Sequence, residues 1–137
     1  MIDRNLGLIF ILLVSASCRR FQRFEGEYIS GSVSVSEGLF PQARRPNTVL
    51  FIVARNHADI PVAVRRFINP SFPLHYSLGR QDLTVPGARW TGPLTLLASV
   101  DQDGVIGPPA KGDMIGVYPG AVQVGDSRVD IQINQIN

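Results

Sequence analysis

The side chains that could hold a copper ion in this sequence are Cys18, His57, His75 and Met114. A blue-copper site needs two histidines and a cysteine, often with a methionine, brought together in one cluster. Cys18 lies near the N-terminus, and none of these residues has the short spacing of a ligand loop. We therefore predict no metal site and no cofactor. His57 is interpreted as an exposed turn residue and His75 as an ordinary strand residue.

Patterns that carry catalysis are also missing from the sequence. It contains no Gly-x-Ser-x-Gly elbow, no Cys-x-x-Cys pair, no Cys-x-x-Cys-His haem-attachment sequence and no glycine-rich phosphate loop. Residues 101–104, Asp-Gln-Asp-Gly, look like part of a calcium loop, but the further ligands of an EF-hand do not follow. A type I turn explains them. We predict no catalytic residues, and we predict that the protein is not an enzyme.

The single cysteine lies where an export signal would end. It follows an apolar run over residues 6–14 and three small residues at 15–17. A secretory signal peptide has this organisation, and a cysteine directly after the small residues resembles the bacterial lipoprotein signal, in which the thiol carries the lipid. We predict a signal peptide over residues 1–17, lipidation of Cys18 and a tether over residues 18–26. An uncleaved membrane helix is disfavoured, because the run is short against the roughly 20 apolar residues that span a bilayer. A cleaved soluble form with a chance cysteine is the remaining alternative.

This interpretation predicts a lipid-anchored protein that faces the periplasm of a bacterial cell envelope. Arg19, directly after Cys18, favours the outer membrane slightly over the inner one. Thirteen basic residues against eleven acidic ones leave a net charge of only +2. Charge therefore predicts no nucleic-acid partner.

Arginines and one tryptophan are the candidate partner-binding residues. Arg55, Arg65 and Arg66 lie at or near the ends of two neighbouring predicted strands, and Arg44-Arg45 precede them. They could present a basic patch to an acidic partner, although solvated strand ends are the simpler interpretation. Because side chains alternate across a strand, Arg65 and Arg66 face opposite sides, so one of them should have a partner within the fold. Trp90 could anchor an interface or close one end of the fold.

The elements that would position these side chains are all strands. We expect them at residues 28–35, 48–54, 60–67, 72–78, 94–100, 114–118 and 129–133. Residues 48–54 are continuously apolar, which predicts a strand buried on both faces, and residues 38–47 read as a loop. The strand over 128–134 could accept an extended peptide along its edge. Residues 27–137 are therefore predicted to form one all-β domain, a β-sandwich of about six to eight strands.

The order of segments resembles a known family. Residues 31–35 (Gly-Ser-Val-Ser-Val) come first. Phe51 to Arg55 and Pro61 to Arg65 follow, in the order and at the separation of the family strands "D-T-x-F-x-F-A-R" and "P-x-A-V-x-R", with Val53 where the first pattern has Phe. Gly112-Asp113 comes late. This series resembles the C-terminal Ig-like (cupredoxin-like) domain of the cytochrome c-type biogenesis protein H (CycH) family, from about Gly31 to Ile133. The arginine of the family's "A-R-x-S-x-x-G" is absent here, since residues 98–104 read Ala-Ser-Val-Asp-Gln-Asp-Gly.

The resemblance implies an Ig-like β-sandwich and a role in assembling c-type cytochromes. Its partners would then be apocytochrome c or components of the haem-ligation machinery. Family members place tetratricopeptide helices ahead of this domain, and this sequence has a lipoprotein-type signal there instead. We therefore predict a non-catalytic binding or assembly module, and the alternative is a structural or stress-linked envelope lipoprotein that shares only the fold. The oligomeric state is left open.

Overall fold

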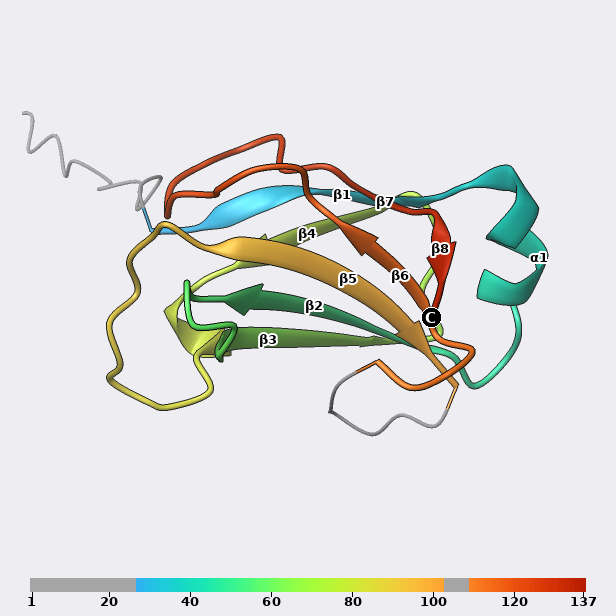
Figure 1. Cartoon of the computed structure of the whole chain (residues 1–137), viewed down its shortest axis with the longest axis horizontal. Coiled ribbons are helices and arrows are strands. Elements are labelled where there is room, and N and C mark those ends of the chain that lie inside the picture. The colour runs from blue at the N-terminus through green and yellow to red at the C-terminus, as the bar shows by residue number, and fades with distance from the viewer. Residues whose placement is uncertain (1–26, 103–108) are drawn as a thin grey trace, which may run out of the picture.

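The computed structural model describes residues 27–102 and 109–137, which fold into two β-sheets packed face to face (Figure 1). The strands are β1 (Ile29–Val35), β2 (Val49–Arg55), β3 (Pro61–Ile68), β4 (Leu74–Leu78), β5 (Thr95–Asp101), β6 (Met114–Val117), β7 (Ile131–Ile133) and β8 (Gln135–Ile136). Helical turns are short: the 3₁₀ helices η1 (Glu37–Leu39) and η2 (Arg80–Asp82), and the helix α1 (Phe40–Ala43). The predicted all-β sandwich is confirmed.

The larger sheet has the order β3-β2-β5-β6-β8, and the smaller has the order β4-β1-β7. β2 lies inside the larger sheet, with antiparallel neighbours β3 and β5 on its two sides. Its apolar sequence suits this place, because Leu50 and Ile52 are fully buried towards the smaller sheet and Phe51, on the opposite face, is 5% exposed. A strand that is apolar on both faces is stable only where both faces are shielded.

The two long sides of the sandwich are closed in different ways. On one side β7 pairs in parallel with β1 and lies against β6, where the Asn134 amide donates to the Ile115 carbonyl at 3.1 Å. Gly116 makes this approach feasible, because a Cβ there would overlap the Gln132 backbone. On the other side, between β3 and β4, the Arg65 Nη1 donates to the Ser77 carbonyl oxygen at 2.6 Å. One side is therefore closed by backbone and the other by a side chain.

Two expectations from the sequence are wrong: the loop over residues 38–47 and the free strand edge in the C-terminal segment. Residues 38–47 are not an irregular loop, because η1 and α1 form there; Pro41 lies in the first turn of α1, where its missing amide costs nothing. β7 ends the smaller sheet, but residues 132–134 do not offer a free edge, because β6 lies against them at Gln132 and Asn134. Within residues 27–102 and 109–137, no helix is long and apolar enough to span a membrane.

Candidate functional site

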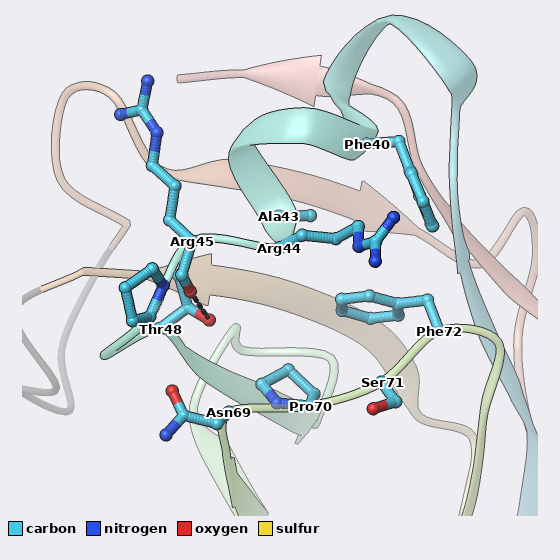
Figure 2. A pocket seen from close by; sticks show the side chains of 10 residues that line it. Phe40, Ala43, Arg44, Arg45, Thr48, Asn69, Pro70, Ser71 and Phe72 are labelled. Atoms are coloured by element: carbon cyan, nitrogen blue, oxygen red, sulfur yellow. Dashed lines mark hydrogen bonds between the residues drawn. The ribbon is translucent and has the colours of Figure 1, made fainter.

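A groove lies at the end of the sandwich where β2 begins, between α1 and the connection from β3 to β4 (Figure 2). Its volume is about 480 Å³. The residues that line it are Phe40, Ala43, Arg44, Arg45, Pro46, Thr48, Asn69, Pro70, Ser71 and Phe72. Two segments that are distant in the sequence therefore form this groove together.

One arginine and two phenyl rings shape the interior of the groove. The Arg44 guanidinium lies over the Phe40 ring, with its Cζ 5.2 Å from the ring centroid. Figure 2 shows Phe72 on the other side of the same guanidinium, while the Arg45 side chain points away from the rings. Stacking on a ring fixes the cation while leaving its N–H groups able to donate.

The charge of the groove is entirely positive. None of the described residues that line it is acidic, and no ion pair between described residues involves Arg44 or Arg45. Both arginines are exposed. A cation without a nearby carboxylate keeps its full attraction for an anion that arrives from solution.

Hydrogen bonds hold the two walls of the groove together. The Asn47 amide donates to the Asn69 Oδ1 at 2.9 Å, and the Asn69 amide donates to the Thr48 carbonyl oxygen at 2.8 Å. The Thr48 hydroxyl donates to the Arg45 carbonyl oxygen at 3.0 Å. Asn47 and Asn69 both have positive φ, a conformation that asparagine tolerates better than most residues. The groove is therefore preformed, because its walls are tied to the same end of β2.

These features suit an anionic partner group next to an apolar one. A carboxylate could accept hydrogen bonds from Arg44 while a neighbouring apolar side chain packs against Phe40 and Phe72. Among residues 27–102 and 109–137, no group of three or more histidine, cysteine or acidic side chains could hold a metal ion. The groove offers binding contacts and no arrangement of a nucleophile with a base.

The predicted arginines do not converge on one patch. Arg55 lies at the far end of β2 from the groove, opposite Pro61 in the register of β3. Its Nε is buried and has no hydrogen-bond partner among the described residues. Arg66 is exposed on the outer face of the larger sheet, opposite Phe51. Arg65 faces the other way and donates to Ser77 within the fold, as the alternation of the strand predicts.

The remaining candidate residues lie away from the groove. Trp90 is 4% exposed within the main core and its Nε1 donates to the Glu27 carbonyl oxygen at 2.7 Å, so its indole closes the fold and is not offered at the surface. His57 and His75 are exposed. Cys18, the predicted lipidation site, lies outside the described residues, as do the whole predicted signal peptide and the whole predicted tether.

Among the described residues, Tyr76 has a clearly raised pKa, and its role is structural. Burial, with smaller contributions from Asp130 and Tyr118, raises the pKa of Tyr76 well above its usual range. The Tyr76 hydroxyl donates to the Val129 carbonyl oxygen at 2.7 Å and links β4 to the segment that precedes β7. This tyrosine therefore stays neutral and holds the smaller sheet together.

Sequence reasoning missed the groove as a site, although it noted Arg44-Arg45. The missing information is spatial, because residues 69–72 show no pattern that links them to residues 40–48. The only local signal was Pro41 directly after Phe40, which marks a helix start. A helix predicted at Phe40 would have placed Arg44 and Arg45 at the end of the sandwich.

Comparison with known proteins identifies a family and one similar protein for this domain. The family profile described as the cytochrome c-type biogenesis protein H Ig-like domain matches residues 29–134. A protein of Aquifex aeolicus (strain VF5), described as uncharacterized, is 29% identical over 116 residues, which are 84% of this chain and 75% of that protein. No solved structure matches the chain.

Proposed function

The chain belongs to the family of the cytochrome c-type biogenesis protein H Ig-like domain, and from this membership we propose that it is a non-catalytic protein-binding module in the maturation of c-type cytochromes. The proposed partners are apocytochrome c or components of the haem-ligation machinery. The domain would hold such a partner by a surface contact while other proteins perform the covalent chemistry.

One observation carries the binding role: in the groove Arg44 stacks on Phe40 with Phe72 nearby, and none of the described residues that line the groove is acidic. A structural domain gains little from an exposed arginine pair without a carboxylate, because unpaired like charges repel each other. A binding module gains attraction for an acidic partner, and the stacked guanidinium is already oriented. This distribution of charge supports binding over a purely structural role.

The location belongs to the same proposal. We propose that Cys18 carries a lipid, so that residues 18–26 tether the sandwich to a membrane and the domain faces the periplasm. A tether would keep the groove near other membrane-bound proteins and raise its effective concentration for them. Mass spectrometry of the membrane-extracted protein tests this, because the Cys18→Ser variant should lose both the lipid mass and the membrane association.

The direct test is a pull-down of the detergent-solubilised protein from its own cell envelope, with mass spectrometry of the proteins that accompany it. We expect enrichment of apocytochromes or haem-ligation components. The double variant Arg44→Ala/Arg45→Ala should recover much less of them. Arg89→Ala is the matched control, because Arg89 is also exposed but lies outside the groove.

A second readout is cellular. Deletion of the protein should lower the amount of haem-stained cytochrome c, and Arg89→Ala should restore it where the double variant does not. Unchanged cytochrome levels on deletion, together with a pull-down that yields only unrelated envelope proteins, would refute the biogenesis role. That result would favour a structural envelope protein that shares only the fold.

A further inference from the structure

The outer edge of β3 lies next to the groove and is a second candidate binding surface. β3 is the terminal strand of the larger sheet, and only β2 pairs with it along its length. Its first half is capped, because the Thr84 amide donates to the Val62 carbonyl oxygen at 3.0 Å and Leu83 forms a bridge with Ala63. Its second half has no such cover among the described residues.

The direction of the backbone groups follows from two hydrogen bonds. The Val62 carbonyl points outward to Thr84, and the Asn69 amide points inward to Thr48 at the start of β2. Successive residues of a strand point their backbone N–H and C=O groups to opposite sides. The N–H and C=O groups of Val64, Arg66 and Ile68 therefore point away from β2. Among the described residues, no hydrogen bond reaches the outward backbone groups of Arg66 or Ile68. The open stretch from Val64 to Ile68 is about 16 Å long.

The neighbouring strand of the smaller sheet is not equally open. The Ser77 carbonyl of β4 already accepts the 2.6 Å hydrogen bond from the Arg65 Nη1. That guanidinium also lies over the Phe67 ring, with its Cζ 5.4 Å from the centroid. Arg65 therefore spans the open side of the sandwich and occupies one outward carbonyl of β4, that of Ser77, while the second half of the β3 edge is left accessible.

The edge leads directly into the groove. β3 ends at Ile68, which is 65% exposed, and the next four residues, 69–72, line the groove. An extended chain that paired with β3 would reach Arg44 and the two phenyl rings as it continued past Ile68. The unpaired edge and the cationic groove therefore form one continuous surface, which we call the edge-and-groove surface: Val64 to Ile68 with the ten groove residues.

The positive charge of the edge-and-groove surface indicates what kind of segment it binds. An exposed arginine on an edge strand ordinarily discourages pairing, and two copies of this chain paired through β3 would bring Arg66 of each close to Arg66 of the other. Like charges across a strand pair are destabilising. An acidic segment has the opposite effect, because Arg66, Arg44 and Arg45 all attract it.

We propose that the edge-and-groove surface binds an extended acidic peptide segment of a partner protein, which adds as a strand to β3 and places a carboxylate and an apolar side chain in the groove. Main-chain hydrogen bonds would supply affinity, and the groove would supply specificity. This inference rests on the proposed protein-binding function and names the kind of segment that is bound.

The test uses the full chain in detergent and a labelled, acetylated peptide of alternating valine and threonine, flanked at both ends by Asp-Phe-Glu. The control peptide has lysine in place of each acidic residue. By fluorescence anisotropy, we expect the acidic peptide to bind and the lysine peptide not to bind. Arg44→Ala/Arg45→Ala should weaken binding by about tenfold, the effect of losing roughly one charged hydrogen bond.

The variant Ile68→Pro probes the edge itself. Proline at this position removes an outward amide and leaves the ladder with β2 intact, which edge strands tolerate. Its control, Ile68→Ala, keeps the amide. We expect about tenfold weaker peptide binding for Ile68→Pro than for Ile68→Ala, with both variants folded by circular dichroism.

Amide hydrogen exchange gives a readout that does not depend on a variant. The amides of Arg66 and Ile68 should exchange fast in the free protein and become protected when the acidic peptide binds. Unchanged exchange at these two amides, equal binding of both peptides, or equal binding by Ile68→Pro and Ile68→Ala would overturn the inference. Protection that depends on protein concentration without peptide would also overturn it, because a second copy would then occupy the edge.

The proposed function and this inference fail separately. If Ile68→Pro recovers cytochrome maturation proteins from the envelope as well as the unmodified protein does, the edge inference is wrong and the binding function stands. If neither protein recovers them while the acidic peptide still protects the edge amides, the maturation role is wrong and the edge-and-groove surface stands.

Discussion

The substitution Gly116→Ala should destabilise the domain, because it forces β6 and β7 apart. The added Cβ would overlap the Gln132 carbonyl oxygen and lie within 2.6 Å of its carbon and 3.0 Å of the Ile133 Cα. These are backbone atoms and cannot rotate away. Overpacking of this kind costs about 1–3 kcal/mol. Loss of the 3.1 Å hydrogen bond from the Asn134 amide to the Ile115 carbonyl adds about 1 kcal/mol.

The expected loss of unfolding free energy is therefore about 2–4 kcal/mol, a large part of the roughly 5–15 kcal/mol that stabilises a typical domain. At about 4 °C per kcal/mol, Tm should fall by roughly 8–16 °C. Urea unfolding can be followed by fluorescence, because Trp90 is the single tryptophan and is 4% exposed in the folded protein. The matched control is Gly38→Ala, where an added Cβ meets nothing within 4 Å.

Gly38→Ala should leave stability unchanged or raise it by about 0.4–1 kcal/mol, because alanine restricts the unfolded chain. If Gly116→Ala unfolds at the same urea concentration as the unmodified protein, β7 does not lie against β6 as described. This side of the sandwich would then be open, and residues 132–134 would be available as a binding edge.

Three further substitutions test buried polar contacts. Tyr76→Phe should cost about 1 kcal/mol at neutral pH by removing the bond to Val129. Because the pKa of Tyr76 is raised in the folded state, its stabilisation is fully present below the unfolded pKa of about 10 and is lost as the pH rises beyond it. The stability of the unmodified protein and of Tyr76→Phe, measured from pH 8 to pH 11 (about one unit above that pKa), should therefore converge; a constant difference would contradict the buried, neutral hydroxyl. Trp90→Phe should cost about 1–3 kcal/mol, through the lost bond to Glu27 and the space left behind, as measured by circular dichroism on heating. Asp113→Ala should cost about 1–2 kcal/mol in urea unfolding, because the Ala110 amide loses its 2.6 Å partner, whereas an effect near zero would show that solvent replaces that contact.

Local sequence patterns were sufficient to predict most of the strands. Residues 48–54 were expected as a strand and β2 covers Val49–Arg55, because a run of branched and aromatic residues has few other stable environments. The alternation over residues 72–78 likewise identified β4, in which Tyr76 and Leu78 are buried and His75 is exposed. These signals are local, so they do not require the rest of the fold to be known.

The features that the sequence did not predict depend on contacts between distant segments. β8 has only two residues and exists because it pairs with β6. The short helix α1 follows Gly38 and precedes two arginines, a composition that favours a loop, and burial of Ala43 in the main core stabilises it instead. The sequence of residues 38–47 has no periodic pattern that would predict the burial of Ala43.

The arginines show where a stronger inference was available. The turn over residues 56–60, together with a one-residue shift of register between Ala54 and Arg55, places Arg55 opposite Pro61 and Arg66 opposite Phe51. Arg55 and Arg66 are therefore several residues apart along the sheet and could not form one patch. Counting residues from the turn would have shown this, whereas the groove of Arg44 required the packing of α1.

Arg65 connects the stability of the sandwich with its proposed binding surface. The sheets meet through backbone at β6 and β7, so the side between β3 and β4 must be closed by other means or leave two strand edges open. By donating to Ser77, Arg65 satisfies an outward carbonyl of β4 from the inner face of β3. Its own strand gains no partner from that bond, because the side chain and not the backbone spans the gap. A residue that closes the sandwich therefore also occupies an outward carbonyl of β4, while the outward groups of Arg66 and Ile68 on β3 have no hydrogen bond among the described residues.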